Sequence, residues 1–153
     1  MNIASTMLAN RTAVPVARTS YDPRGVLRSV TVFGLLGIAL IHLLDLPGTI
    51  GPAPMQGMLY IALVVTCLAA AVAFLHATSW LRWMVVATIG TAPFVTYILT
   101  RTVGLPFDHA DVGNWGDQLG VAALFVESIV VLTALYALWL ERDQRPRRPL
   151  GRR

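Results

Sequence analysis

The sequence predicts an all-α integral membrane protein: a four-helix bundle with antiparallel neighbouring spans and both termini in the cytoplasm. Three observations predict it. Of the 153 residues, 56% are hydrophobic and only 13% are charged, about half the charge density of a typical soluble domain. Four long apolar segments occur, and because each helical span takes about 20 residues, little room is left for a soluble catalytic domain. Nearly all arginines lie at the ends of these segments that face one side of the membrane.

The elements follow in order along the chain. Residues 1–25 mix Ser, Thr, Arg and Pro without an apolar core, so they are expected to form a disordered cytoplasmic leader and not a signal peptide. The first span is predicted at 26–46. Pro47 and Gly48 follow it directly, and this pair is expected to end the helix.

Three further spans complete the predicted transmembrane domain, 26–140. The second, at 57–75, contains no charged residue. A tight turn leads into the third, at 83–100, which Pro93 is expected to kink because proline removes a backbone donor. The fourth span is predicted at 119–140.

The distribution of arginine predicts the orientation. With the amino terminus inside, eleven arginines lie on the cytoplasmic side and only Arg101 lies outside, which agrees with the positive-inside rule. Aromatic residues near the span ends, Trp83 among them, are expected at the membrane interfaces. The chain is therefore predicted to be a multi-pass protein of a cell (inner) membrane.

Residues 141–153 are expected to form a basic cytoplasmic tail. Such a tail is an ordinary topogenic anchor, but its arginines also suit anionic lipid, each contributing about 1 kcal/mol near the surface. No aromatic residue follows Trp139 to stack on bases, so nucleic acid is not expected as a partner. The candidate lipid-facing residues are Arg142, Arg145, Arg147 and Arg148.

Three ionisable residues inside the spans form the predicted polar cluster, His42, Asp45 and Glu127. Inserting a charged side chain at the centre of a membrane helix costs about 2.5–3.5 kcal/mol, so such a residue is expected to have a structural or functional role. Glu127 lies about 12 Å into the fourth span. His42 and Asp45 share one face of the first span at spacing i,i+3. These side chains are expected to point into the bundle.

Small residues predict which spans meet. Gly34 and Gly37 lie on the first span, and Gly120 and Ala123 lie on the face of the fourth span that carries Glu127. Such residues let helices approach closely. We therefore expect the first and fourth spans to pack together.

Two roles remain open for Glu127. It can make a structural interhelical hydrogen bond with His42, Thr96 or Tyr97. A protonated carboxylic acid that exchanges its proton would instead suit proton-coupled transport. With one such acid, only four spans and no visible repeat, the structural role is the favoured interpretation.

The connection between the last two spans is rich in acidic residues. Asp117 has the position of an N-cap for the fourth helix. Arg101 is expected to pair with an aspartate of this connection or with Glu127. Asp108, His109 and Asp111 complete the outer-loop candidates.

A divalent metal site is a weaker hypothesis for the same region. Imidazole and carboxylate groups are suitable ligands, and His42, Asp45 and His109 would supply them. These residues come from separate segments, and no HExxH or CxxC spacing occurs.

Enzymatic motifs are absent from the sequence. It contains no GxSxG, P-loop or GxGxxG motif, no lysine and only one cysteine, Cys67, so we expect no enzyme. No cofactor is expected either, because His42 and His76 lie near opposite membrane faces and cannot ligate one haem together.

One stretch resembles known sequences. The runs LTRTVGLP (99–106), VGNW (112–115) and LG (119–120), together with Glu127, are similar to a stretch of small, uncharacterised multi-span inner-membrane proteins of high-GC bacteria. The resemblance covers about 30 of the 153 residues. It implies no activity, but it implies a bacterial inner-membrane protein whose outer loop and fourth span belong together.

Two functional hypotheses follow from these observations. The first is a non-enzymatic membrane subunit, scaffold or sensor with a protein partner or a second copy of itself. The alternative is a small proton- or metal-linked carrier that uses Glu127 and the outer His/Asp cluster.

Overall fold

The computed structural model describes residues 22–106, 109 and 111–143. Within this part of the chain, four α-helices follow one another, α1 (Pro23–Thr49), α2 (Pro54–His76), α3 (Trp80–Thr102) and α4 (Gln118–Asp143). Each is long and apolar enough to cross a membrane. The prediction of an all-helical protein with four candidate spans is therefore confirmed.

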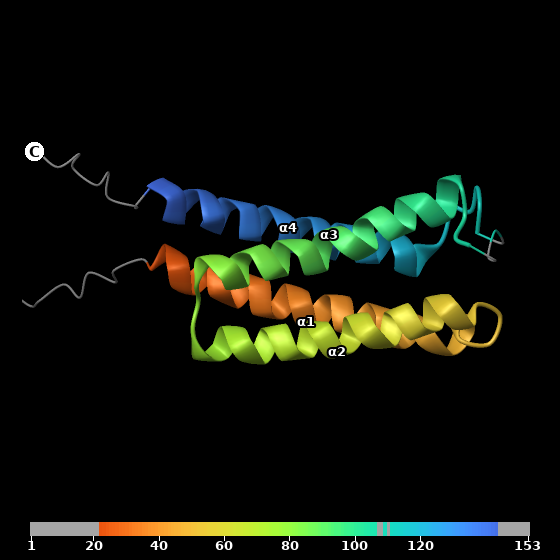
Figure 1. The fold of residues 1–153 in the computed structure, drawn as a ribbon, viewed down its shortest axis with the longest axis horizontal. Coiled ribbons are helices and arrows are strands. Elements are labelled where there is room, and N and C mark those ends of the chain that lie inside the picture. The colour runs from red at the N-terminus through yellow and green to blue at the C-terminus, as the bar shows by residue number, and fades with distance from the viewer. Residues whose placement is uncertain (1–21, 107–108, 110, 144–153) are drawn as a thin grey trace, which may run out of the picture.

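The helices form two pairs that meet along α1 and α4 (Figure 1). The helix α1 packs against α2, α3 packs against α4, and α1 also packs against α4, whereas α2 and α3 contact each other only sparsely. The start of α1, the end of α4 and the α2–α3 turn lie at one end, here called the basic end (Figure 1). The α1–α2 and α3–α4 connections lie at the opposite end, here called the loop end.

The helix α1 begins earlier than predicted. The Asp22 carboxylate accepts a hydrogen bond from the backbone N–H of Arg24 at 3.0 Å, and Pro23 occupies the first helical position. An aspartate N-cap followed by proline is a strong signal for the start of a helix. The N–H groups of the first turn have no acceptor within the helix, so the missing N–H of proline costs nothing there. The last residues of the predicted leader thus belong to α1, and residues 1–21 lie outside the described part.

The prediction that Pro47 and Gly48 end the first span is wrong. The helix continues through Pro47 to Thr49, and the backbone N–H of Ile50 still donates to the carbonyl of Leu46 at 2.9 Å. The Thr49 hydroxyl donates to the carbonyl of Asp45 at 3.1 Å. Proline removes one backbone donor, and in the last turn the remaining hydrogen bonds are sufficient to hold the helix.

The apolar core extends from the middle of the bundle toward the basic end. Its ring pair is Phe74 of α2 and Trp83 of α3, whose centroids are 4.8 Å apart. Trp83 lies in the first turn of α3, and only 3% of it is exposed, because α2 and α3 come together at their short turn. The other core side chains are Leu35, Ile38, Ala39, Cys67, Ala71, Val86, Ile89, Val130, Ala134 and Ala137.

The glycines of α1 lie where α4 packs against it, as the sequence predicts. A Cβ at Gly34 would collide with the side chain of Val130, and a Cβ at Gly37 would lie 3.2 Å from Val126. Small residues at these positions let the two backbones approach closely. The two helix pairs, α1 with α2 and α3 with α4, are therefore joined through the contact between α1 and α4.

Two arginines hold the end of α2. Arg82 donates from Nη1 to the carbonyls of Ala73 at 3.0 Å and Ala77 at 2.6 Å, and Arg28 donates to the carbonyl of Leu75. The last carbonyls of a helix have no partner within it, and cations there interact favourably with the helix dipole. These arginines therefore stabilise the basic end as well as carrying charge.

Candidate functional site: a cavity toward the loop end

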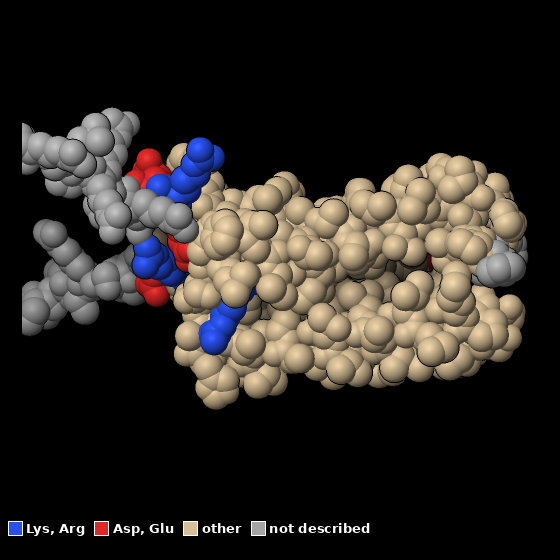
Figure 2. All heavy atoms as spheres, viewed as in Figure 1, with Lys and Arg blue, Asp and Glu red and all other residues tan. Residues whose placement is uncertain are grey.

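A cavity of about 160 Å³ lies between α2 and α3 and is lined by side chains of all four helices. Figure 2 shows a hollow in the molecule away from the basic end, with acidic atoms inside it. The cavity exists because α2 and α3 contact each other so little, while α1 and α4 close its back. The lining residues that matter chemically are His42, Asp45, Tyr60, Tyr97, Arg101 and Glu127.

Glu127 is the deepest acidic group of the cavity. It lies on the buried face of α4 with Ala123 and Val130, and only 1% of it is exposed. Its Oε1 is 3.8 Å from Nε2 of His42 on α1, too long for a hydrogen bond. Its Oε2 has no hydrogen-bond partner among the residues that the structure describes. The structure thus brings two members of the predicted cluster together across the α1–α4 contact without joining them.

A backbone carbonyl determines which nitrogen of the neutral His42 ring carries the proton. Nδ1 of His42 is 2.9 Å from the carbonyl oxygen of Ile38. A carbonyl only accepts hydrogen bonds, so Nδ1 carries the proton in the neutral ring. Nε2 then presents a lone pair toward Glu127. A donor placed between Nε2 and the carboxyl group would satisfy both.

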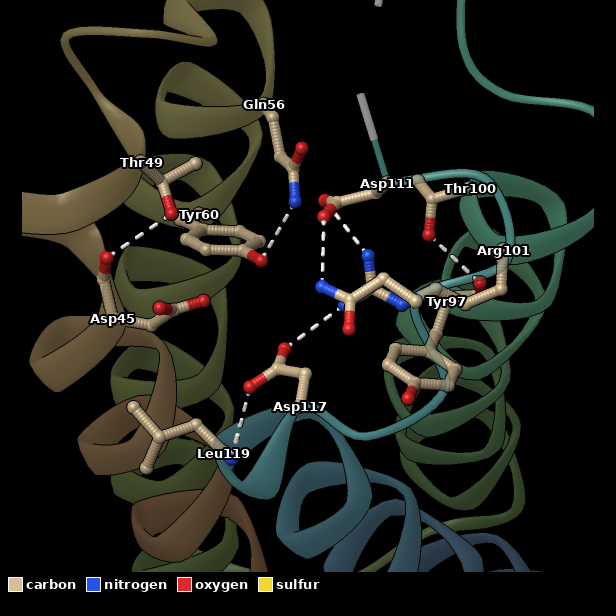
Figure 3. Close-up of polar contacts among 11 residues, drawn as sticks. Asp45, Thr49, Gln56, Tyr60, Tyr97, Thr100, Arg101, Asp111, Asp117 and Leu119 are labelled. Atoms are coloured by element: carbon tan, nitrogen blue, oxygen red, sulfur yellow. Dashed lines mark hydrogen bonds and ion pairs between the residues drawn. The ribbon is translucent and has the colours of Figure 1, made fainter. Parts of the chain in front are cut away.

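Asp45, the third member of the cluster, also lines the cavity. It lies within electrostatic reach of His42 and Tyr60. Figure 3 shows its carboxylate beside the Tyr60 ring, across the open space from Asp117. The face predicted from the i,i+3 spacing is therefore the face that borders the cavity.

The helix α2 contributes two site residues that the sequence analysis missed. The Tyr60 and His42 rings are nearly perpendicular, with centroids 4.8 Å apart, and the Tyr60 hydroxyl accepts a hydrogen bond from Gln56 at 2.9 Å. A glutamine four residues before a tyrosine, in a segment without charges, is the signal that could have found them. Tyrosine alone is equally typical of a membrane interface.

Arg101 closes the cavity at the loop end. Its Nη1 lies 2.7 Å from Oδ2 of Asp111, and its Nη2 donates to Oδ2 of Asp117 at 2.9 Å. The guanidinium also lies over the Tyr97 ring, 4.7 Å from the centroid. The carbonyl of Arg101 accepts from the backbone of Gly113 at 2.9 Å. This residue joins the end of α3 to the connection and to α4 (Figure 3).

Asp117 combines the two roles expected in this region. Its Oδ1 accepts from the backbone N–H of Leu119 at 3.1 Å, and its carbonyl accepts from Val121 at 3.0 Å, so it caps α4. Its other oxygen pairs with Arg101. Arg101 therefore pairs with aspartates of the connection, and not with Glu127.

Gly120 of α4 sets the distance between α3 and α4 beside the cavity. A Cβ at this position would collide with the Tyr97 ring and lie 2.8 Å from Oδ2 of Asp117. Two residues of α4, Gly120 and Val130, face different neighbouring helices. Gly120 faces α3, whereas Val130 faces Gly34 of α1. The Tyr97 hydroxyl is buried and has no hydrogen-bond partner within residues 22–106, 109 and 111–143.

The remaining predicted candidates are not part of the cavity. His109 is exposed, and its carbonyl accepts from Val112. No group of three His, Cys, Asp or Glu residues that could hold a metal ion occurs in the described part of the chain, so the predicted trio of His42, Asp45 and His109 is not assembled. Asp108 and the tail residues Arg145, Arg147 and Arg148 lie outside the described residues, whereas Arg142 lies in the last turn of α4.

Comparison with protein-family models, with curated protein sequences and with solved structures found no match.

Proposed function

We propose that the protein is a non-enzymatic, multi-pass membrane protein that serves as a sensing subunit of a membrane assembly, with a small molecule held in the cavity as its signal. The division of the bundle carries this proposal. A cavity lined by apolar side chains and a few ionisable ones lies toward the loop end, and a packed apolar core extends toward the basic end. A molecule in the cavity contacts all four helices, so its binding favours one packing of the helices over another.

The packing of the core favours sensing over transport. A carrier exposes its site to each side of the membrane in turn. Between the cavity and the basic end, however, the bundle contains a packed core with several side chains at most 3% exposed. These include Leu35, Phe74, Trp83, Val86 and Val130. Transport would require this core to separate.

The test purifies the full chain from its native membranes in mild detergent and measures the intact mass of its complexes. We expect a stoichiometric partner, or a second copy of the chain, and a bound small molecule. Ala123 is buried and lines the cavity, so Ala123→Leu is expected to lose the small molecule. Ala122→Leu, on the exposed side of α4, is the matched control and is expected to retain it.

Two outcomes would overturn the proposal. The absence of both a partner and a second copy in the wild-type preparation would exclude the subunit role. Equal small-molecule mass in Ala123→Leu and Ala122→Leu would exclude the cavity as the sensing site.

A proton-linked carrier is the second candidate function, supported by the buried pair of His42 and Glu127. A carboxyl group inside a membrane bundle can serve as a proton relay. Glu127→Gln retains the size of the side chain but cannot exchange a proton. Loss of uptake by this variant, with partner association retained, would favour the carrier over the sensor.

We further propose that the protein lies in a bacterial inner membrane with both termini on the cytoplasmic side. Each helix would then cross the membrane in the direction opposite to the helix before it. Arg24, Arg28, Arg82 and Arg142 lie in the helix turns nearest the basic end, and Figure 2 shows positive side chains gathered there. At the loop end, Arg101 is buried and paired with two aspartates. The positive-inside rule assigns the basic end to the cytoplasm.

The basic end is also proposed to contact anionic lipid. Arg28 and Arg82 bind carbonyls of α2, whereas Arg142 is exposed at the end of α4. Together with Arg145, Arg147 and Arg148, it would face the lipid headgroups. Replacing these four arginines with glutamine is expected to reduce the anionic lipid that co-purifies with the protein. Unchanged lipid content would refute this contact.

A further inference from the structure

We infer that the molecule held in the cavity is a small primary alkylammonium ion, whose N–H groups meet Glu127 and whose alkyl group fills the apolar space between α2 and α3. This inference rests on the proposed function, because it names the chemical class of the molecule that the cavity holds.

The size of the cavity limits the ligand. Its volume of about 160 Å³ is close to that of engineered protein cavities of about 150 Å³ that bind benzene. A molecule of about four to six non-hydrogen atoms therefore fits. Apolar side chains border the same space, among them Ile41, Leu63 and Ala92, so part of the ligand is expected to be hydrocarbon.

The charges around the cavity favour a cation over an anion. The lining contains Asp45, Asp117 and Glu127 against Arg101 and His42. The positive charge of Arg101 is already matched, because carboxylate oxygens of Asp111 and Asp117 lie 2.7 and 2.9 Å from its guanidinium nitrogens. An anion would find no unmatched positive group here unless the His42 ring gained a second proton. A cation would meet the carboxylates of Asp45 and Glu127.

An unpartnered oxygen indicates where the cation binds. Oε2 of Glu127 is buried without a hydrogen-bond donor in the described part of the molecule, a costly arrangement for a polar atom. An ammonium group supplies up to three N–H donors. One donor satisfies Oε2, and a second can reach Nε2 of His42, which lies 3.8 Å from Oε1 of Glu127. A quaternary ammonium has no N–H and would leave Oε2 unsatisfied.

Aromatic rings complete the chemical match. Tyr60 and Tyr97 both line the cavity, and the faces of aromatic rings attract cations. The protein already uses this interaction, since Arg101 lies over the Tyr97 ring. Recognition thus combines a buried carboxyl group, aromatic rings and a short apolar pocket.

The experiment titrates the purified full-length protein in detergent by calorimetry with three probes of similar shape. These are tert-butylammonium, its neutral counterpart tert-butanol, and tetramethylammonium, which has the charge but no N–H. We expect tert-butylammonium to bind at least tenfold more tightly than the other two. Glu127→Gln is expected to weaken its binding by about tenfold to a hundredfold, as loss of a charge-assisted hydrogen bond implies. Glu141→Gln, the same change near the basic end of α4, is expected to leave binding unchanged.

Each other result would overturn the inference. Equal binding of tert-butanol would show that the cavity selects shape and not charge, and equal binding of tetramethylammonium would show that N–H donors are not used. Wild-type affinity in Glu127→Gln would place the ammonium elsewhere. If no probe binds the wild-type protein, the ligand class is wrong. The proposed function is still judged separately by the small-molecule mass that the protein carries from its native membranes.

Discussion

Arg101 is joined to Asp117 by a hydrogen-bonded ion pair of 2.9 Å that links the last turn of α3 to the N-cap of α4. Only 4% of the arginine side chain is exposed, against 28% for the aspartate. A chain segment of fifteen residues, 103–117, connects the two helices. The pair fixes both ends of this connection and forms the loop-end wall of the cavity.

Arg101→Gln is therefore expected to destabilise the protein. Removing one partner of a fully buried ion pair costs about 3–5 kcal/mol, and the partial exposure of the aspartates reduces the expected loss to about 2 kcal/mol. Arg101→Lys should lie between this variant and the wild type, because lysine retains the charge without the fork of donors. Denaturant unfolding of the purified protein, followed by circular dichroism, measures the difference. Wild-type stability in Arg101→Gln would contradict the role of the pair.

Gly120→Ala tests the approach of α3 to α4. The new Cβ would collide with the Tyr97 ring, so overpacking is expected to cost about 1–3 kcal/mol. Gly116→Ala is the matched control, because a Cβ there meets nothing within 4 Å, and it should leave the thermal midpoint unchanged. Tyr97→Leu should partly rescue Gly120→Ala in a double-mutant cycle. Simple additivity of the two changes would show that the residues are not coupled.

The orientation can be tested with single cysteines. Cys67 is the only cysteine of the sequence, and its side chain is fully buried. It should therefore not react with a membrane-impermeant maleimide. In intact cells we expect Gly116→Cys, in the α3–α4 connection, to be labelled. Thr78→Cys, in the α2–α3 turn, should be labelled only after the membrane is opened. The reverse pattern would invert the proposed topology.

Arg82 offers a test that separates hydrogen bonding from charge. It donates to two carbonyls at the end of α2, so Arg82→Gln is expected to lower the free energy of unfolding by about 1 kcal/mol. Arg142→Gln removes the same charge from the same end, but Arg142 is exposed, and its stability should change by less than about 0.5 kcal/mol. Denaturant unfolding of both variants provides the comparison. Equal losses would mean that charge alone stabilises the basic end.

The fold was largely predictable because few solutions bury four apolar segments. The length of the apolar segments predicts the helices. The cost of placing an ionisable group in a membrane predicts that His42 and Glu127 point into the bundle. The glycines of α1 indicate its contact with α4. Local exceptions were harder to foresee. Pro47 is tolerated because the last turn of α1 loses only one hydrogen bond, and the burial of Trp83 depends on how closely the short turn brings α2 to α3.

The site was predictable only in part. Counting charges assigns arginines to a side of the membrane, but it does not reveal that Arg28 and Arg82 bind the carbonyls of α2. A tyrosine near a span end, such as Tyr60, is typical of a membrane interface, and its contact with His42 depends on the rotation of α2, which an apolar sequence hardly constrains. The cavity results from the sparse contact between α2 and α3, a property of the assembled bundle and not of any one segment.

The separation of the apolar core from the cavity has a consequence for how the sequence can change. The residues that hold the bundle together, such as Leu35, Phe74 and Val86, lie apart from those that border the open space. Substitutions at Ala92 or Thr96, which line the cavity and are not part of the core cluster, would therefore alter what the cavity accepts at little cost to folding. The same scaffold is suited to acquire a different ligand, in nature or by engineering, while its inner packing stays constant.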